Sequence, residues 1–281
     1  MYKKFFFLFS IMPLPVNHFF GYLIGFFTYL FRTETKKVIT KNIQLCFPSL
    51  SEKQRKSLIY KAHIENGKTL TESSKIWLKS FEKNKKLIKS IKGIESLKSK
   101  KPVILMVPHY GCWEITGRII AIENRLTFMY KKLDSPDKEN YLLSKRQQGN
   151  LSMATADRSG VIKMQKSLKS GEIIGILPDQ FPGIDSGERS TFFGHDAYTM
   201  TLLVKLAKKN NAKVILTWAE RLSFGRGYKL NLKPVDITSS DNEIENLNRM
   251  NLVIENLISL KPEQYLWSYK RFKYIVDYNS L

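Results

Sequence analysis

Cysteine is scarce in this sequence, with only Cys46 and Cys112 in a chain of 281 residues. No disulfide framework can therefore hold the fold together, and a reducing compartment is the natural setting. Glycine and proline are also few, at 15 and 10, so a collagen-like or low-complexity chain is excluded. Acidic residues are outnumbered, because 25 Asp and Glu face 46 Lys and Arg, for a formal net charge of +21. This excess favours polyanionic partners, namely nucleic acid, anionic lipid or an acidic protein.

Several motifs of known chemistry are missing. No G-x-S-x-G, H-E-x-x-H or C-x-x-C occurs, which disfavours α/β-hydrolase and zinc chemistry. Gly67-Lys68-Thr69 ends like a phosphate-binding loop, but Ala62 stands where that loop needs glycine, and the surrounding pattern is helical. This departure from the motif disfavours nucleotide hydrolysis as well.

An apolar stretch without any charged residue occupies positions 5–31. Two prolines and the polar pair Asn17-His18 divide it into halves, and each half is shorter than the roughly 20 apolar residues that a spanning helix needs. Three arrangements stay open: a tilted or kinked single span, a helix lying in the interface, or an apolar hairpin folded onto the domain. No small-residue cleavage site follows, so a removable signal peptide is not expected. The sequence predicts a membrane-anchor segment at 1–31.

A basic block follows this stretch directly. Residues 32–101 contain nineteen Lys and Arg against six Asp and Glu. Cations next to an apolar segment hold that side in the cytoplasm and attract anionic lipid, each contributing on the order of 1 kcal/mol. The alternative is a solvated helical face, and charge alone does not separate the two.

The remainder, 32–281, alternates strand-like and helical patterns. Ser51 opens a helical stretch with the S-x-x-Q form of a capping box, and a second helical pattern covers 70–81. Short apolar runs rich in β-branched residues predict buried strands, and 228–232 alternates like an edge strand. The expected strands are 103–107, 173–177, 214–218 and 228–232, and the helices between and after them are 117–122, 161–168, 199–209 and 243–260. This order predicts one α/β domain with a mixed central sheet flanked by helices.

His109 is the outstanding candidate for chemistry, whereas His18, in the apolar stretch, and His63, on a helix, are expected to be structural. His109 comes directly after the predicted strand 103–107, and the carboxyl ends of α/β strands are where ligands and chemistry are placed. Glu114 lies five residues further on. On one continuous helix the two would point about 140° apart, but a turn at Gly111 would let the carboxylate reach back to the imidazole.

This pair suits proton abstraction from a hydroxyl. A neutral imidazole accepts the proton, and a carboxylate behind it fixes the tautomer and stabilises the cation. Backbone N–H groups at the start of the following helix can hold an oxyanion. A nucleophilic Cys112 paired with His109 is the alternative, but three residues of separation across a tight turn give no evident geometry for attack.

The H-x4-E spacing resembles the H-x4-D/E motif of glycerolipid-type acyltransferases. Over nearly its whole length the sequence resembles the bacterial lipid A biosynthesis (late) acyltransferase family. Five ordered blocks carry the resemblance: 42–48 followed by Leu50-Ser51, His109–Glu114, Leu177–Gln180 followed by Gly183, Phe192–Gly194 with Ala197 and Thr199, and Pro262–Trp267 leading to Arg271–Lys273. The sequence departs from the pattern at Cys112, where the family usually carries Asn.

The resemblance implies a glycerolipid-acyltransferase-like fold and an O-acyltransferase at the cytoplasmic face of the bacterial inner membrane. The acyl group would pass from acyl carrier protein, or another acyl thioester, to a hydroxyl of a lipid A precursor. His109 would act as general base with Glu114 orienting it, and no cofactor or metal would be required. The expected partners are acyl carrier protein, the glycolipid acceptor and inner-membrane lipids, and no nucleic acid.

Further polar residues are candidates for substrate contacts. Asp179 and Gln180 end a predicted strand and are expected to support other site residues or to contact the substrate, and a simple turn is the competing interpretation. Glu263 lies beside the aromatic residues Tyr265 and Trp267 and is expected to need a partner such as Arg271. The full set of candidates is Arg146, Arg158, Asp179, Gln180, Arg189, Arg221 and Glu263, and for the arginines a solvated position is the alternative to phosphate binding.

Two other functions compete with transfer to lipid A. The acceptor can be another glycolipid or a lysophospholipid, since the same chemistry serves related hydroxyls. A basic, membrane-associated nucleic-acid-binding protein would also explain the charge. The sequence disfavours it, because the aromatic residues gather in the apolar stretch and the predicted core rather than among Lys and Arg, where bases would stack.

Overall fold

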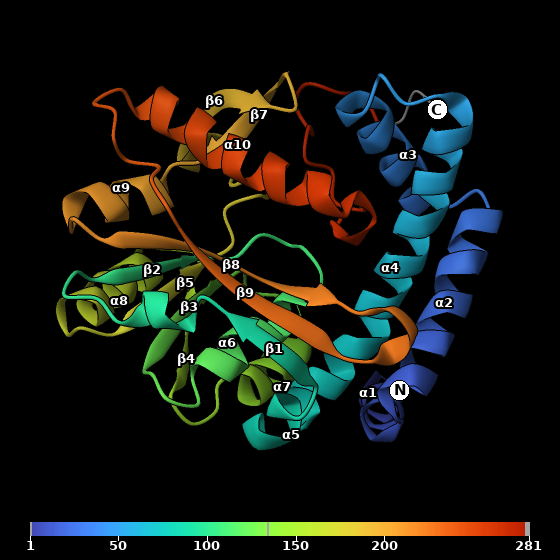
Figure 1. Ribbon diagram of the computed structural model, residues 1–281, viewed down its shortest axis with the longest axis horizontal. Helices are drawn as coiled ribbons and strands as arrows, with labels where there is room; N and C mark the ends of the chain where they lie inside the picture. Colours follow the sequence, from blue (N-terminus) through green and yellow to red (C-terminus); the bar gives the residue numbers. More distant parts are fainter. Residues whose placement is uncertain (1, 134, 279–281) are drawn as a thin grey trace.

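Short runs of apolar residues build the centre of a seven-stranded sheet in this computed structural model, which describes residues 2–133 and 135–278. β2 (Val103–Met106) and β5 (Ile173–Ile176) are buried along their whole length, as strands covered on both faces must be. The order across the sheet is β1-β9-β8-β2-β5-β3-β4, and every neighbouring pair is parallel except β8 with β9. Helices cover the sheet on both sides (Figure 1). The predicted mixed sheet flanked by helices is therefore confirmed.

The sequence patterns found four of these strands and missed the others. In the large sheet the patterns found β2, β5, β8 (Lys213–Arg221) and β9 (Tyr228–Val235), and they missed β1 (Ile88–Lys92), β3 (Leu126–Tyr130) and β4 (Leu151–Thr155). They also missed a separate antiparallel hairpin that pairs β6 (Gly187–Phe192) with β7 (His195–Met200). The prediction that 228–232 is an edge strand was wrong, because the short, lysine-rich β1 pairs with β9 on its outer side.

The helices follow the predicted order with shifted ends. One helix, α4 (Glu52–Leu78), replaces the two expected over 51–81, and both hydrogen bonds of its capping box are present between Ser51 and Gln54. The prediction for α10 (Glu243–Leu260) is confirmed at both ends. The other helices of the body are α3 (Glu34–Cys46), α5 (Phe81–Lys85), α6 (Trp113–Ile120), α7 (Pro136–Arg146), α8 (Arg158–Lys169) and α9 (Leu202–Lys209).

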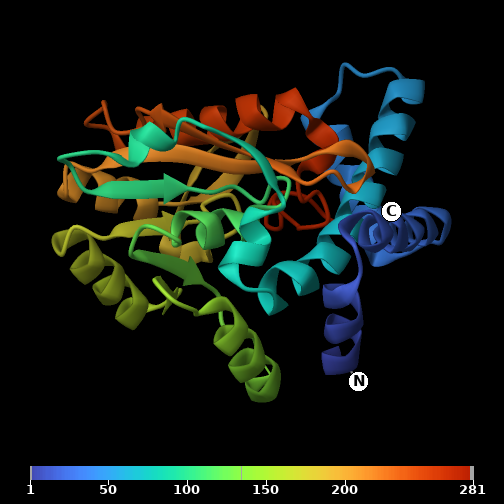
Figure 2. The ribbon, with the colours of Figure 1, turned by 60° about the horizontal axis from the view of Figure 1, so that its bottom comes forward.

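The apolar stretch forms two helices, α1 (Tyr2–Ile11) and α2 (Leu14–Leu30), which break at the prolines. Both lie against α4 at one side of the molecule (Figure 1), and α1 projects beside α7 in the turned view (Figure 2). Within the described residues no single helix is long and apolar enough to cross a membrane. Helices α2 and α3, which are bent by 83° where they meet, have together the length and apolar composition of a membrane span. The domain division at residue 31 stays a prediction.

Glycines bring α2 and α4 into backbone contact. A Cβ atom on Gly67 would lie 2.1 Å from the carbonyl oxygen of Gly21 and 2.7 Å from the backbone nitrogen of Gly25. His63, one turn away on α4, accordingly lies buried against α2, where its Nδ1 is 2.9 Å from the Thr28 hydroxyl. Burial lowers the pKa of His63 to about 4. Its structural role, like that of Gly67 in a helix rather than a phosphate loop, is confirmed.

The two faces of α2 differ sharply. Its inner face supplies the glycines and buried polar groups, whereas its outer face exposes apolar side chains to solvent. Together with α1, this outer face presents Phe5, Phe7, Leu8, Ile11, Val16, Phe19, Phe20, Tyr22, Phe26, Phe27 and Leu30.

The close helix contact predicts an unusual response to alanine. At an exposed helical site Gly→Ala stabilises by about 1 kcal/mol, but Gly67→Ala is expected to lower the free energy of unfolding by about 1–3 kcal/mol, because its Cβ meets backbone that cannot move aside. Denaturant unfolding of the full chain in detergent measures this. Ser57→Ala, exposed on the same helix, is the matched control, and a Gly67→Ala protein as stable as that control would contradict the contact.

Candidate active site

Parallel pairing brings His109 and Asp179 together. β2 and β5 are neighbours in which Met106 pairs with Ile176, and both strands end at these residues. Each functional side chain lies three residues past its strand, so equal offsets from a shared register place them side by side at the carboxyl edge of the sheet. The carboxyl edge is the side at which open α/β sheets bind their ligands.

The Asp179 carboxylate holds His109 at two points. Oδ1 lies 2.9 Å from the ring Nδ1, and Oδ2 accepts a hydrogen bond of 2.9 Å from the backbone N–H. Asp179 is buried, and burial alone would raise its pKa, but the charge and hydrogen bonds of His109 hold the pKa of this carboxyl below its ordinary value. An ionised Asp179 makes Nδ1 the donor, which leaves Nε2 with a free lone pair.

The Nε2 atom of His109 faces Gln180. The amide nitrogen of Gln180 lies 3.2 Å from Nε2 and can donate to its lone pair, while the ring edge packs against Trp113 at 5.0 Å between centroids. The His109 side chain is 14% exposed. The imidazole is thus fixed in orientation, with Nδ1 toward the buried Asp179 carboxylate and Nε2 toward Gln180. Asp179 and Gln180, predicted as substrate contacts, both contact the imidazole itself.

Glu114 lies beside this pair but does not hold the imidazole. Its Oε2 accepts from the Trp77 indole N–H at 2.8 Å, and its Oε1 accepts from the Arg146 guanidinium. The expected contact between Glu114 and His109 was wrong, because Glu114 stands in the first turn of α6 and turns toward α4 and α7. The group that meets Nδ1 is Asp179. The guanidinium of Arg146 also stacks over the Trp77 ring at 4.7 Å. Arg146 therefore contacts Glu114 rather than His109, and its role in substrate binding stays a prediction.

The loop after His109 is fixed by segments far away in the chain. The His109 carbonyl accepts from Leu266 N–H at 3.0 Å, and Gly111 N–H donates to the Gln264 carbonyl at 3.0 Å. Gly111 has φ +59, and a Cβ there would lie 2.1 Å from the carbonyl oxygen of Ala219. Glycine is needed at this position both for the left-handed backbone and for the close approach to β8.

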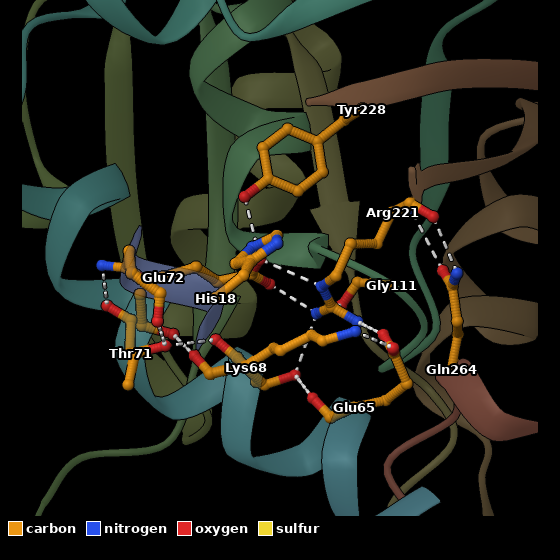
Figure 3. A network of polar contacts seen from close by, with 12 residues as sticks. His18, Glu65, Lys68, Thr71, Glu72, Gly111, Arg221, Tyr228 and Gln264 are labelled. Carbon is orange, nitrogen blue, oxygen red and sulfur yellow. Dashed lines mark hydrogen bonds and ion pairs between the residues drawn. The ribbon is translucent and has the colours of Figure 1, made fainter. Parts of the chain in front are cut away.

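Arg221 is the centre of a buried polar network (Figure 3). Its Nε and Nη2 bind the Glu72 carboxylate, its Nη1 binds Glu65, and its Nη2 also donates to the Thr69 hydroxyl and, at 3.0 Å, to the Gly111 carbonyl. The Gln264 side chain pairs with both backbone groups of Arg221. Prediction of Arg221 as a substrate contact was wrong: the side chain is 1% exposed and is occupied by the protein itself.

Glu72 completes the network. His18 Nε2 lies 2.9 Å from its Oε2, and the Tyr228 hydroxyl donates to the same atom at 2.8 Å. Burial alone would raise the pKa of Glu72, but the charge of Arg221 and the hydrogen bond from His18 hold it far below its ordinary value. His18 is therefore structural, as predicted, and it fastens α2 to the network that supports the His109 loop.

The other predicted residues do not meet at His109. Arg158 is exposed at the start of α8, and Arg189 is exposed on β6, where its guanidinium lies 5.6 Å from the Tyr198 ring. Glu263 lines a hollow of about 490 Å³ together with Lys68 and Lys261, whereas Arg271, its expected partner, donates to Tyr198 and Thr199. The substrate roles of Arg158, Arg189 and Glu263 stay predictions.

The geometry gives no support to Cys112 as a nucleophile. Its thiol is buried, and burial raises its pKa well above the ordinary value, with the Glu72 charge adding to the effect. Both ring nitrogens of His109 face other residues. The fold and the site are those of an α/β protein with a strand-end histidine oriented by a buried carboxylate, an arrangement suited to proton abstraction from a hydroxyl.

Comparison with known proteins identifies the family. Residues 1–274 match the model of the bacterial lipid A biosynthesis acyltransferase family. The chain is 28% identical to the lipid A biosynthesis lauroyltransferase of Escherichia coli K12, covering 93% of this chain and 87% of that protein. It is 30% identical to a lipid A biosynthesis acyltransferase of Haemophilus influenzae, covering 94% and 87%. The chain therefore belongs to this family, and it is an acyltransferase.

The buried network predicts the consequence of losing its cation. Arg221→Met would leave the buried Glu72 carboxylate without its guanidinium partner and Glu65 with Lys68 as its remaining cation, and we expect the free energy of unfolding to fall by about 3–5 kcal/mol. Denaturant unfolding measures it. The triple variant Arg221→Met, Glu65→Gln, Glu72→Gln removes both buried carboxylates together with the guanidinium and is expected to be more stable than the single one. Unchanged stability with a raised KM in Arg221→Met would instead return Arg221 to substrate binding.

Proposed function

We propose that this acyltransferase moves a fatty acyl group from the thioester of acyl carrier protein to a hydroxyl of a lipid A precursor, with His109 as general base. The observation that carries the proposal is the orientation of His109: Asp179 fixes Nδ1 as donor, which leaves the lone pair of Nε2, beside the Gln180 amide, to accept a proton. The relatives' names supply the acceptor, since they are lipid A lauroyl-, palmitoleoyl- and myristoyltransferases.

The reaction follows from the positions of these groups. The acceptor hydroxyl displaces the Gln180 amide from Nε2 and gives its proton to the imidazole, while its oxygen attacks the thioester carbonyl. Asp179 stabilises the imidazolium that forms. The tetrahedral intermediate then expels the thiolate, which takes the proton back from Nε2. N–H groups in the first turn of α6, four residues beyond His109, favour the negative oxygen.

The charge of the chain supports acidic substrates on both sides of this reaction. The formal charge of +21 attracts the acidic carrier protein and a phosphorylated glycolipid alike, chiefly by accelerating their encounter with the enzyme. Acyl carrier protein as donor remains part of the proposal, and an acyl thioester of coenzyme A is the competing donor.

Membrane attachment belongs to the same proposal. The outer faces of α1 and α2 expose many aromatic and aliphatic side chains, and apolar surface gathered in this way is typical of membrane or partner contacts. With the basic block beginning at Arg32, we place these helices in the interface at the cytoplasmic face of the inner membrane, where an amphipathic surface binds without spanning. This position would bring the acceptor lipid to the enzyme within the plane of the membrane.

Transfer of a radiolabelled acyl group from acyl carrier protein to a tetra- or penta-acylated lipid A precursor tests the proposal. We expect His109→Ala and Asp179→Asn each to lower kcat by about a hundredfold or more, since one loses the base and the other its correct tautomer. His195→Gln, a histidine that binds the Leu45 carbonyl on a different face, is the control and should keep its activity.

Two results would redirect the proposal. Normal turnover in His109→Ala would remove the mechanism altogether. An inactive Glu114→Gln beside a fully active Asp179→Asn would give the orienting role back to Glu114. If folded wild-type protein fails to label the lipid A precursor, the acceptor is another glycolipid or a lysophospholipid, which the same assay identifies by exchanging the lipid.

A further inference from the structure

The turn between β8 and β9 carries an unusually exposed aromatic side chain. Phe224 is 89% exposed, more than any other large apolar side chain in the described part of the chain. Its backbone has φ 59 and ψ 28, a left-handed conformation that residues with a side chain seldom adopt. Backbone strain of this kind clusters at functional sites, which makes the surroundings of Phe224 worth following.

The turn is held rigidly against α2. Gly225 also has positive φ, and a Cβ there would lie 2.5 Å from the Cα of Pro15 at the start of α2. Leu222 N–H donates to the Gly227 carbonyl at 2.9 Å, which closes the turn. Figure 1 shows the hairpin of β8 and β9 reaching across to α2. Phe224 is therefore presented at a fixed place rather than on a loose loop.

Three cations surround a hollow at the base of this turn. Lys89 from β1, Arg226 from the turn and Lys229 from β9 line about 500 Å³ together with Leu222 and Gly225. All three side chains are exposed, and no carboxylate lines the hollow in the described structure. Such a cradle, open to solvent and positive throughout, fits a phosphate group.

On its other side the turn meets the apolar face of α2. Phe224 lines the 490 Å³ hollow together with Phe19 and Tyr22, which belong to the exposed row along that helix. The aromatic tip, the apolar row of α2 and the cationic hollow are thus adjacent. Apolar groups next to cations are the arrangement that a bilayer surface matches, with acyl chains below and phosphates at the level of the cations.

We propose that the turn after β8 is a second membrane contact, in which Phe224 enters the acyl-chain boundary of an anionic bilayer and Lys89, Arg226 and Lys229 bind a phospholipid phosphate. The occupant is a phospholipid of the membrane and not a substrate of the transferase. The inference builds on the proposed membrane attachment through α1 and α2, and it adds a contact that would fix how the domain is rotated on the membrane.

A fluorophore on the turn tests the insertion. Cys46 and Cys112 are both buried, so Phe224→Cys in the full-length protein can be labelled with an environment-sensitive dye. With vesicles of equal parts phosphatidylcholine and phosphatidylglycerol, we expect a blue shift and quenching by brominated acyl chains. Ile162→Cys is the matched control, because it is exposed on α8 at the opposite side of the molecule (Figures 1 and 2), and its dye should not respond.

Charge reversal tests the phosphate cradle. Lys89→Glu, Arg226→Glu and Lys229→Glu together are expected to weaken binding to these vesicles about tenfold or more. The control with the same change in net charge is Lys166→Glu, Lys169→Glu and Lys209→Glu, on exposed positions of α8 and α9, and it should bind almost as the wild type does. Both triple variants should keep acyl transfer to detergent-dispersed acceptor.

Three outcomes would overturn the inference. If the protein binds vesicles while the dye at position 224 does not respond, α1 and α2 suffice and the second contact does not exist. If both triple variants weaken vesicle binding equally, the effect comes from net charge alone, and Lys89, Arg226 and Lys229 form no specific phosphate site. Protection of the dye by free glycerol phosphate without vesicles would make the hollow a site for a soluble ligand. Absence of acyl transfer to the detergent-dispersed acceptor by the wild-type protein would count against the proposed function and not against this membrane contact.

Discussion

A buried guanidinium must have its donors paired, and this requirement for Arg221 organises the molecule. The carboxylates that satisfy it come from α4, one acceptor is the Gly111 carbonyl in the loop that carries His109, and the Gln264 side chain fixes the Arg221 backbone. Removing any of these groups would leave charge or polar atoms buried without a partner, which costs more than an exposed ion pair contributes. The position of the loop that carries His109 therefore depends on this buried network.

The same network explains why the N-terminal helices belong with the body of the protein. His18 joins Glu72, and the glycines of α2 lie against the backbone of α4. The inner side of α2 is thus committed to polar and close backbone contacts within the domain, while its outer side keeps the apolar residues. An apolar segment that looked like a simple anchor serves both as a wall of the fold and as an exposed surface.

Local patterns were sufficient for some parts of this structure. The capping box at Ser51 marked the start of α4, and the apolar runs at β2 and β5 located the buried strands. The pairing of His109 with Asp179 was also accessible in principle, since both lie three residues beyond strands that prove to be neighbours. What was missing was the strand order, which depends on contacts between distant segments and not on any local pattern.

The partners of Glu114 and Arg221 show the limit of reading local spacing. Glu114 was assigned to His109 because it was near in sequence, but its contacts come from Trp77 and Arg146, more than thirty residues away on either side. Arg221 was a candidate for binding substrate phosphate, but the structure buries its side chain against Glu65 and Glu72 of α4. The strands β3, β4 and β6 were missed because their mixed composition carries little signal without the neighbours that cover them.

The residues of this network are synthesised at widely separated times. Glu72 is separated by 149 residues from Arg221 and by 156 from Tyr228. Helices α2 and α4 can associate early, since they are close in sequence, but the carboxylates on α4 lack the Arg221 guanidinium until β8 has been made. The nascent hairpin must keep that side hydrated while the sheet is being completed. Closure of the active-site loop is therefore a late event in folding, tied to the last third of the chain.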